Sequence, residues 1–169
     1  MSVRFWLSLV ISSTLAGSAL AGEPARIPAQ APPAAQPALA VTCDFIEIGA
    51  TKGKTPVKEP SIDPKLGAVE KKLKKALFSA QWAEFKQLSQ ATKKLEKKKT
   101  ETIALKQGSA TATLVEIVDK SKVRITVTID NAKGKQAVNT TTLLDAGDYV
   151  IHAVVLPNED GHLLAVTCK

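Results

Sequence analysis

Apolar and polar residues alternate strictly in residues 122–130, and this pattern constrains the fold more than any other feature of the chain. Successive side chains of a strand point to opposite faces of a sheet, so the segment is predicted to bury one face and to solvate the other. The buried positions are Val123, Ile125, Val127 and Ile129.

Similar β-type runs occur along most of the chain, separated by turns rich in Gly, Pro, Asn and Asp. Because the connections are short, neighbouring strands are expected to be antiparallel. The sequence therefore predicts a mainly β (α+β) domain, an antiparallel meander or sandwich with one helix on its N-terminal side. The other predicted strands are residues 41–48, 100–105, 110–118, 135–144, 148–156 and 162–168.

The one helix is predicted for residues 64–77. Asp63 is a suitable N-cap, and Pro64 fits the first helical position. Apolar residues then recur at helical spacing, from Leu66 to Leu77. Residues 82–99 are ambiguous, because large apolar side chains also recur there every three or four residues, which by itself favours a second helix.

The first 40 residues are predicted to lie outside the folded domain. Residues 1–21 have a basic residue, Arg4, then an apolar stretch and an Ala-x-Ala pattern, as in a cleavable signal peptide. Residues 22–40 consist mainly of Pro, Ala and Gln, which predicts a flexible tether before a single domain in residues 41–169. We therefore expect an exported protein of the periplasm or extracellular space that does not span a membrane.

The only two cysteines, Cys43 and Cys168, lie at the two ends of the predicted domain. In an oxidising compartment an even pair indicates a disulfide, here one that ties the first strand to the last. The alternative, two free thiols or metal ligands, lacks further soft ligands nearby in the sequence. No metal site is predicted.

The order of these segments resembles a loosely defined group of exported bacterial proteins, common in myxobacteria-like organisms, that carry no assigned activity. The likeness begins near Asp63, and its most specific piece is Trp-Ala-Glu-Phe-Lys-Gln-Leu-Ser-Gln at residues 82–90. In that group this piece is similar to the start of a strand, so the resemblance implies a strand at residues 85–95. The lysine-rich residues 93–99 depart from the pattern, and no functional residue carries over.

Motifs for catalysis and cofactor binding are weak. Residues 49–55 resemble a phosphate loop, but only three residues separate the glycines, and Pro56 stands where a helix should begin. No nucleophile motif and no acid/base pair of carboxylates is present. We therefore expect no enzyme activity and no cofactor, while a site assembled only in three dimensions would leave no motif in the sequence.

Both histidines fall in the last predicted hairpin. With a turn at residues 157–161, His152 faces Val166, and the two imidazoles are four positions apart, too far to share a metal. His152 is expected to be a partly buried strand residue, and His162 a surface residue beside the turn. Glu159 and Asp160 are expected to solvate the tip of this hairpin.

The chain has an excess of positive charge, and most of it comes from lysines. The net charge of the whole chain is +7. This excess could hold the protein against a polyanion, such as lipopolysaccharide, anionic lipid, acidic polysaccharide or released nucleic acid. The alternative is that these lysines only solvate a helix and protect a strand edge. They form two clusters: Lys71, Lys72, Lys74 and Lys75, then Lys93, Lys94, Lys97, Lys98 and Lys99.

These features favour a non-catalytic binding or structural domain of the cell envelope. Its partner is unknown from the sequence, with anionic envelope components or another envelope protein as candidates. Specific nucleic-acid recognition is not expected, because Trp82 and Tyr149 are too few for a stacking platform. The alternative from another class is a hydrolase or inhibitor-like domain whose site forms only in the fold.

Overall fold

The computed structural model describes residues 39–53 and 59–169. The predicted signal peptide and nearly all of the predicted tether lie outside the described residues, as do Lys54 and Thr55 of the loop that resembles a phosphate-binding motif. The first strand begins at Ala40, one residue earlier than expected.

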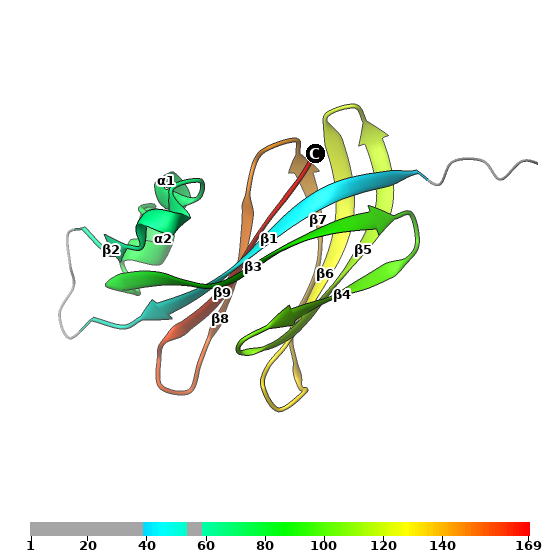
Figure 1. The fold of residues 1–169 in the computed structure, drawn as a ribbon. Coiled ribbons are helices and arrows are strands. Elements are labelled where there is room, and N and C mark those ends of the chain that lie inside the picture. The colour runs from blue at the N-terminus through cyan, green and yellow to red at the C-terminus, as the bar shows by residue number, and fades with distance from the viewer. Residues whose placement is uncertain (1–38, 54–58) are drawn as a thin grey trace, which may run out of the picture. The chain divides into compact units, whose positions relative to one another are not determined.

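Two β-sheets form most of the structure, which confirms the predicted mainly β fold (Figure 1). Sheet A has the strand order β2-β3-β1-β9-β8, and sheet B has the order β4-β5-β6-β7. The strands of sheet A are β1 (Ala40–Thr51), β2 (Ser61–Ile62), β3 (Glu84–Glu96), β8 (Val150–Val155) and β9 (Gly161–Cys168). Those of sheet B are β4 (Thr100–Leu105), β5 (Gly108–Asp119), β6 (Lys122–Asp130) and β7 (Gln136–Asp145).

The predicted meander describes sheet B but not sheet A. In sheet B each strand pairs with the next in sequence, and all pairs are antiparallel. In sheet A, β1 lies between β3 and β9, so the first long strand and the last one are neighbours. The short β2 joins the start of β3 in parallel. The central strands of sheet A therefore come from segments that are far apart in the sequence.

Sheet A is buried on both faces near its centre, which explains why every residue of β9 is buried. One face packs on sheet B through an apolar core that includes Phe45, Ile125 and Val166. The opposite face packs on the helical segment through a second core that includes Ile48, Leu73 and Trp82. Sheet B has no such cover among the described residues, and the outer positions of β6 are polar, as the alternation in residues 122–130 predicted.

The prediction of one continuous helix at residues 64–77 was wrong. The segment forms three short turns: η1 (Pro64–Leu66), α1 (Glu70–Leu73) and α2 (Ala76–Ser79). Asp63 does cap the first of them, since its side chain accepts a hydrogen bond from the Lys65 N–H at 3.0 Å. Leu73 and Phe78 are both buried, but a spacing of five residues does not keep two side chains on one face of a single helix. The chain therefore turns again between α1 and α2.

Strand β3 occupies the ambiguous segment, in agreement with what the resemblance implied and against the helical periodicity. It pairs with β1 along its whole length, with one bulge opposite Glu47 and Ile48. Tertiary pairing supplies the reason, because β1 would otherwise have an unpaired edge next to its core-facing residues.

The predicted register of the last hairpin was wrong by two residues. His152 pairs with Leu164, and His162 pairs with Val154. The turn is tighter than expected, because the Leu156 N–H already bonds to the carbonyl of Asp160 at 2.8 Å. At the end of this turn, Gly161 lies against the Trp82 ring, where a Cβ would come within 2.6 Å of a ring carbon. Only glycine fits this contact without moving the indole.

Candidate functional site

A buried carboxylate, Glu47 in β1, is the most unusual group among the described residues, with only 1 % of its surface exposed. Its Oε1 atom lies 3.0 Å from Nε2 of His162 and accepts the Gln107 N–H at 2.9 Å. Its Oε2 atom accepts the Lys106 N–H at 2.8 Å and the hydroxyl proton of Ser89. We call these five residues the Glu47 cluster.

Alternation along β1 places Glu47 in this position. Cys43, Phe45 and Glu47 point to the same face, toward sheet B, and Ser89 of β3 lies directly opposite Glu47. Lys106 and Gln107 form the turn between β4 and β5. The carboxylate therefore joins three strands of sheet A to a turn of sheet B.

The hydrogen bonds decide the ionisation of Glu47. Burial raises the pKa of a carboxyl group, but the bonds from His162, Lys106, Ser89 and Gln107 together outweigh burial and lower the pKa of Glu47 from 4.5 to about 2. The group is thus an anion that accepts four bonds at neutral pH. All of its donors are supplied by the protein itself.

Serine, histidine and glutamate meet here, as they do in hydrolases, but in a different order. In a catalytic triad the imidazole lies between the hydroxyl and the carboxylate, so that it can take the hydroxyl proton. Here the carboxylate lies between the other two, and Ser89 donates to Glu47. His162 is only 3 % exposed, and the Ser89 hydroxyl bonds to Glu47 and not to His162, so this arrangement links the two sheets through the carboxylate.

The expectation that His162 is a surface residue was wrong. A register shift of two residues does not change the face of a side chain, so the reason is the position of the strand: β9 lies between β1 and β8, and His162 faces sheet B beside Glu47. Sequence reasoning also missed Glu47. The available signal was a carboxylate in an apolar run, Phe45-Ile46-Glu47-Ile48, at a position whose neighbours face the core.

His152 is buried as expected, with 8 % of its surface exposed. Its Nε2 atom has no hydrogen-bond partner among the described residues, and burial lowers the pKa of His152 from 6.5. The folded protein therefore holds this imidazole in its neutral form.

We expect His152 to make the protein less stable as the pH falls below about 6.5, where the unfolded chain takes up a proton that the folded state resists. His152→Leu should flatten the dependence of unfolding free energy on pH between 7 and 5, as measured by urea titration. An unchanged slope would contradict this role. The wild-type slope from this one group is at most about 1.4 kcal/mol per pH unit.

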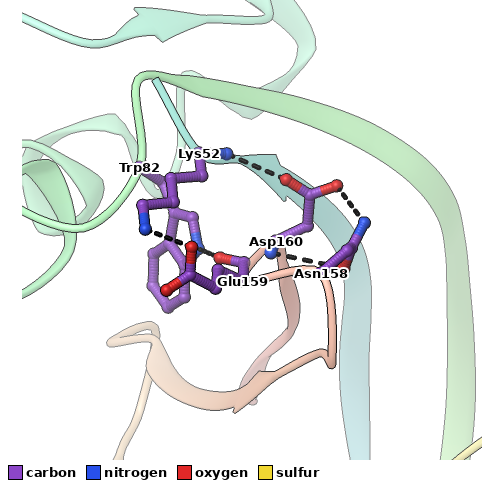
Figure 2. A network of polar contacts seen from close by, with 5 residues as sticks. All are labelled: Lys52, Trp82, Asn158, Glu159 and Asp160. Carbon is purple, nitrogen blue, oxygen red and sulfur yellow. Dashed lines mark hydrogen bonds and ion pairs between the residues drawn. The ribbon is translucent and has the colours of Figure 1, made fainter. Parts of the chain in front are cut away.

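Glu159 and Asp160 do more than solvate the hairpin tip. Asp160 accepts the Lys52 N–H at 2.9 Å, the Lys52 ammonium pairs with Glu159, and the Trp82 Nε1–H donates to the Glu159 carbonyl at 3.1 Å. Asn158 donates to Asp160 at 2.7 Å within the turn. Figure 2 shows these groups converging on the turn, which is thereby fixed to the end of β1 and to the segment before β3.

Cys43 and Cys168 form the predicted disulfide. They lie directly opposite each other on β1 and β9, with Cα atoms 4.0 Å apart. Thr42 and Lys169 exchange both backbone hydrogen bonds in the next pair, so the cysteines occupy a pair without such bonds, where strands approach most closely. Both cysteines are buried in the core between the sheets.

The two predicted lysine clusters are partly brought together. Lys94 lies opposite Thr42, which bonds to the backbone of Lys169. By strand alternation the Lys94 side chain points to the helical side of sheet A. The Lys169 ammonium lies 3.2 Å from Asp44 Oδ2, and Asp44 also points to this side.

Two lysines of the helical segment, Lys72 and Lys75, lie on the same side of sheet A, next to Asp148 and Tyr149. Lys72 lies 2.8 Å from Asp148 Oδ2, and this hydrogen bond is the largest effect that lowers the pKa of Asp148, with the charge of Lys75 acting in the same direction. Burial raises the pKa of the adjacent Tyr149, and the charges of Asp44 and Lys169 both act on it. We call Lys72, Lys75, Lys94 and Lys169 the lysine face.

The remaining lysines of the clusters lie elsewhere. Lys71 and Lys74 belong to α1 and its C-terminal end, where Lys74 pairs with Glu70 at 2.6 Å. Lys93 is half-buried and points to the opposite side of β3 from Lys94. Lys97, Lys98 and Lys99 form the turn between β3 and β4, where Lys99 pairs with Glu96 and Glu101. The sequence clusters are therefore not two separate patches on the surface.

A small hollow of about 100 Å³ lies beside Cys168 and Val41, away from the Glu47 cluster. Lys120, Lys122 and Lys169 line it together with Asp119 and apolar side chains. It holds neither histidine. No cluster of three or more metal-ligating side chains occurs in the part of the chain that the structure describes.

Comparisons with protein-family models, with curated proteins and with solved structures found no match to this chain. Among residues 39–53 and 59–169, no helix has the length and apolar character needed to cross a membrane.

Proposed function

We propose that this protein is a non-catalytic binding domain of the cell envelope, exported by its N-terminal segment, that contacts polyanions through lysine side chains. The observation that carries this proposal is the lysine face, on which parts of both lysine clusters meet. The disulfide supports a site of action in an oxidising compartment, the periplasm or the extracellular space.

The charge balance of the lysine face favours an anionic partner. Asp44 and Asp148 each pair with one lysine, Lys169 and Lys72. Lys94 forms no ion pair among the described residues and is exposed. Lys75 is also exposed, and its charge adds to that of Lys72 beside Asp148. The face thus keeps a positive excess that is screened by salt.

Protection of a strand edge is the competing explanation for some of these lysines. Beyond its first two residues, β3 has no strand on its outer side among the described residues. Lysines on such an edge discourage pairing with another chain. Edge protection does not require Lys75 or Lys169, which lie outside β3, so variants of these residues separate the two explanations.

For the alternative function, a hydrolase or inhibitor-like domain, the candidate site among the described residues is the Glu47 cluster, where a serine, a histidine and a carboxylate meet. Ser89→Ala tests this alternative directly. If a panel of ester and peptide substrates is hydrolysed by the wild type and the rate is lost in the variant, the protein is an enzyme and our proposal is wrong.

We expect the purified protein to bind heparin, lipopolysaccharide and anionic vesicles at low salt, with affinity that falls steeply as salt rises. Changing Lys75, Lys94 and Lys169 together to Gln should weaken binding by about tenfold or more, since each lysine near an anionic surface contributes about 1 kcal/mol. Binding is measured by isothermal titration calorimetry or vesicle sedimentation across a salt series.

A matched control removes the same charge elsewhere. Lys106, Lys133 and Lys135 are exposed lysines at the turns between β4 and β5 and between β6 and β7, and none of them lines the hollow beside Lys169. Changing these three to Gln should weaken binding much less than the change on the lysine face. Equal losses in both variants would show a diffuse charge effect, and absence of binding at low salt would reject the proposal.

A further inference from the structure

The four edge strands of the sandwich differ in how they are protected. On one side, β3 carries Lys86, Lys93 and Lys94, and β4 carries Glu101 between Lys99 and Lys106. On the other side, β7 and β8 both lack charge along most of their length. β7 is mainly polar from Gln136 to Thr142, whereas the segment around β8, from Tyr149 to Asn158, is mostly apolar and has no charged residue apart from the buried His152. Charged edges resist pairing with other chains, and of the two uncharged edges β8 is the apolar one.

The backbone of β8 has groups free for pairing. In an antiparallel pair, every second residue of a strand forms backbone hydrogen bonds with the partner strand. Leu156 is one of these residues, because its N–H bonds to the Asp160 carbonyl. His152 and Val154 therefore bond inward, and the N–H and C=O groups of Ile151, Ala153 and Val155 point away from β9. Among the described residues no strand pairs with this edge of sheet A.

The side chains on this edge are apolar and exposed. Val155 is 60 % exposed, and Ala153 is exposed as well. Both lie on the same side of the sheet as Ile151, which packs against the core under the helical turns. A strand added at this edge would cover Val155 and extend that core.

We propose that β8 is the surface through which two copies of this chain pair, joining their A sheets into one continuous sheet across a two-fold axis. With the axis at Ala153, the register places Ile151 opposite Val155 of the second copy, and Ala153 opposite its own counterpart. These three pairs are the ones whose backbone groups point outward, so each exchanges two hydrogen bonds.

The same register is favourable for the charges. Asp148 lies opposite Asn158 of the second copy, so no like charges meet across the pair. Elsewhere the net positive charge of each copy opposes association. Pairing through β8 should therefore be unchanged or strengthened by salt, the opposite of what we expect for polyanion binding.

The test is sedimentation of the full chain, expressed with its own N-terminal segment, over a concentration series at low and high salt. We expect a reversible dimer, because pairing of one short strand buries less surface than a standard interface. Val155→Lys should raise the concentration needed for dimer formation by at least about tenfold, which corresponds to about 1.4 kcal/mol. Ala153→Pro should act likewise, because it removes an N–H that points outward.

Leu77→Lys is the matched control, since Leu77 is an exposed apolar residue, 67 % exposed, in α2 and far from β8 in sequence. It should leave the dimer unchanged, and thermal melting should show that all three variants are folded. A wild type that stays monomeric at every concentration overturns the proposal. A dimer that persists in Val155→Lys and Ala153→Pro, or open-ended larger species, also overturns it.

Discussion

Replacing Cys43 and Cys168 together by Ala is expected to lower the free energy of unfolding by about 4 to 5 kcal/mol. The bridge joins residues separated by 125 positions, and a cross-link over so long a loop strongly restricts the unfolded chain. Since domains of this size are stable by only about 5 to 15 kcal/mol, the variant should be close to unfolding at room temperature. Urea titration by circular dichroism measures the difference.

Reduction provides the control for this prediction. Wild-type protein unfolded and refolded in dithiothreitol should match the double variant, because both lack the bridge. A single Cys43→Ala variant should behave likewise, and its remaining thiol, Cys168, should become labelled when the protein unfolds. A loss below about 1 kcal/mol would show that pairing of β1 with β9 does not depend on the covalent link.

Glu47→Ala is expected to lower the free energy of unfolding by about 3 to 5 kcal/mol, because several buried donors lose a charged acceptor at a cost of about 1 to 3 kcal/mol each. The substitution leaves the Lys106 and Gln107 N–H groups, the Ser89 hydroxyl and His162 without their acceptor. Each buried group that loses its partner adds a cost. The same urea titration, at pH 7, measures the loss.

The Glu47 carboxylate also predicts a pH dependence. Its pKa is about 2 in the folded protein and 4.5 in the unfolded chain, so the unfolded state binds the proton more readily. Its stabilising effect is therefore full above about pH 5 and is lost as the pH falls toward 2. From the difference in pKa this loss is about 3 kcal/mol.

The comparison with Glu47→Gln isolates this effect, because other carboxyls with lowered pKa act in the same direction. We expect the stability difference between wild type and Glu47→Gln to shrink as the pH falls from 5 to 2. Glu116→Gln is a surface control, since Glu116 pairs with Arg124 at an exposed position, and it should cost less than about 1 kcal/mol. A difference for Glu47→Gln that stays constant with pH would contradict the lowered pKa. The other carboxyls are Asp44, Asp63, Asp119 and Asp148.

The predicted strands and the disulfide agreed with the structure because both depend on local signals. Alternation in β6 reports directly on a sheet with one buried face, and the two cysteines had only each other as partners. Turn residues marked the ends of the strands of sheet B, whose neighbours follow one another in sequence. Local pattern is sufficient when pairing is local.

Local pattern failed where a distant segment decides the conformation. Residues 82–99 have helical periodicity but form β3, because β1, some 40 residues earlier in the chain, supplies the partner. Leu73 and Phe78 both pack in the core against sheet A, although they are five residues apart. The segment therefore forms short helical turns and not the single predicted helix. In the last hairpin, Trp82 and Lys52 hold the turn residues, and neither belongs to the hairpin.

The sequence by itself determined that this chain is mainly β, that its cysteines pair, and that lysines dominate its charge, since alternation, composition and residue counts carry that information. Only the tertiary structure decided that Glu47, Ser89 and His162 meet in the core and that Lys75, Lys94 and Lys169 share one side of sheet A. These groups come from strands and turns far apart in the chain. Their proximity depends on strand order and register, which local patterns do not encode.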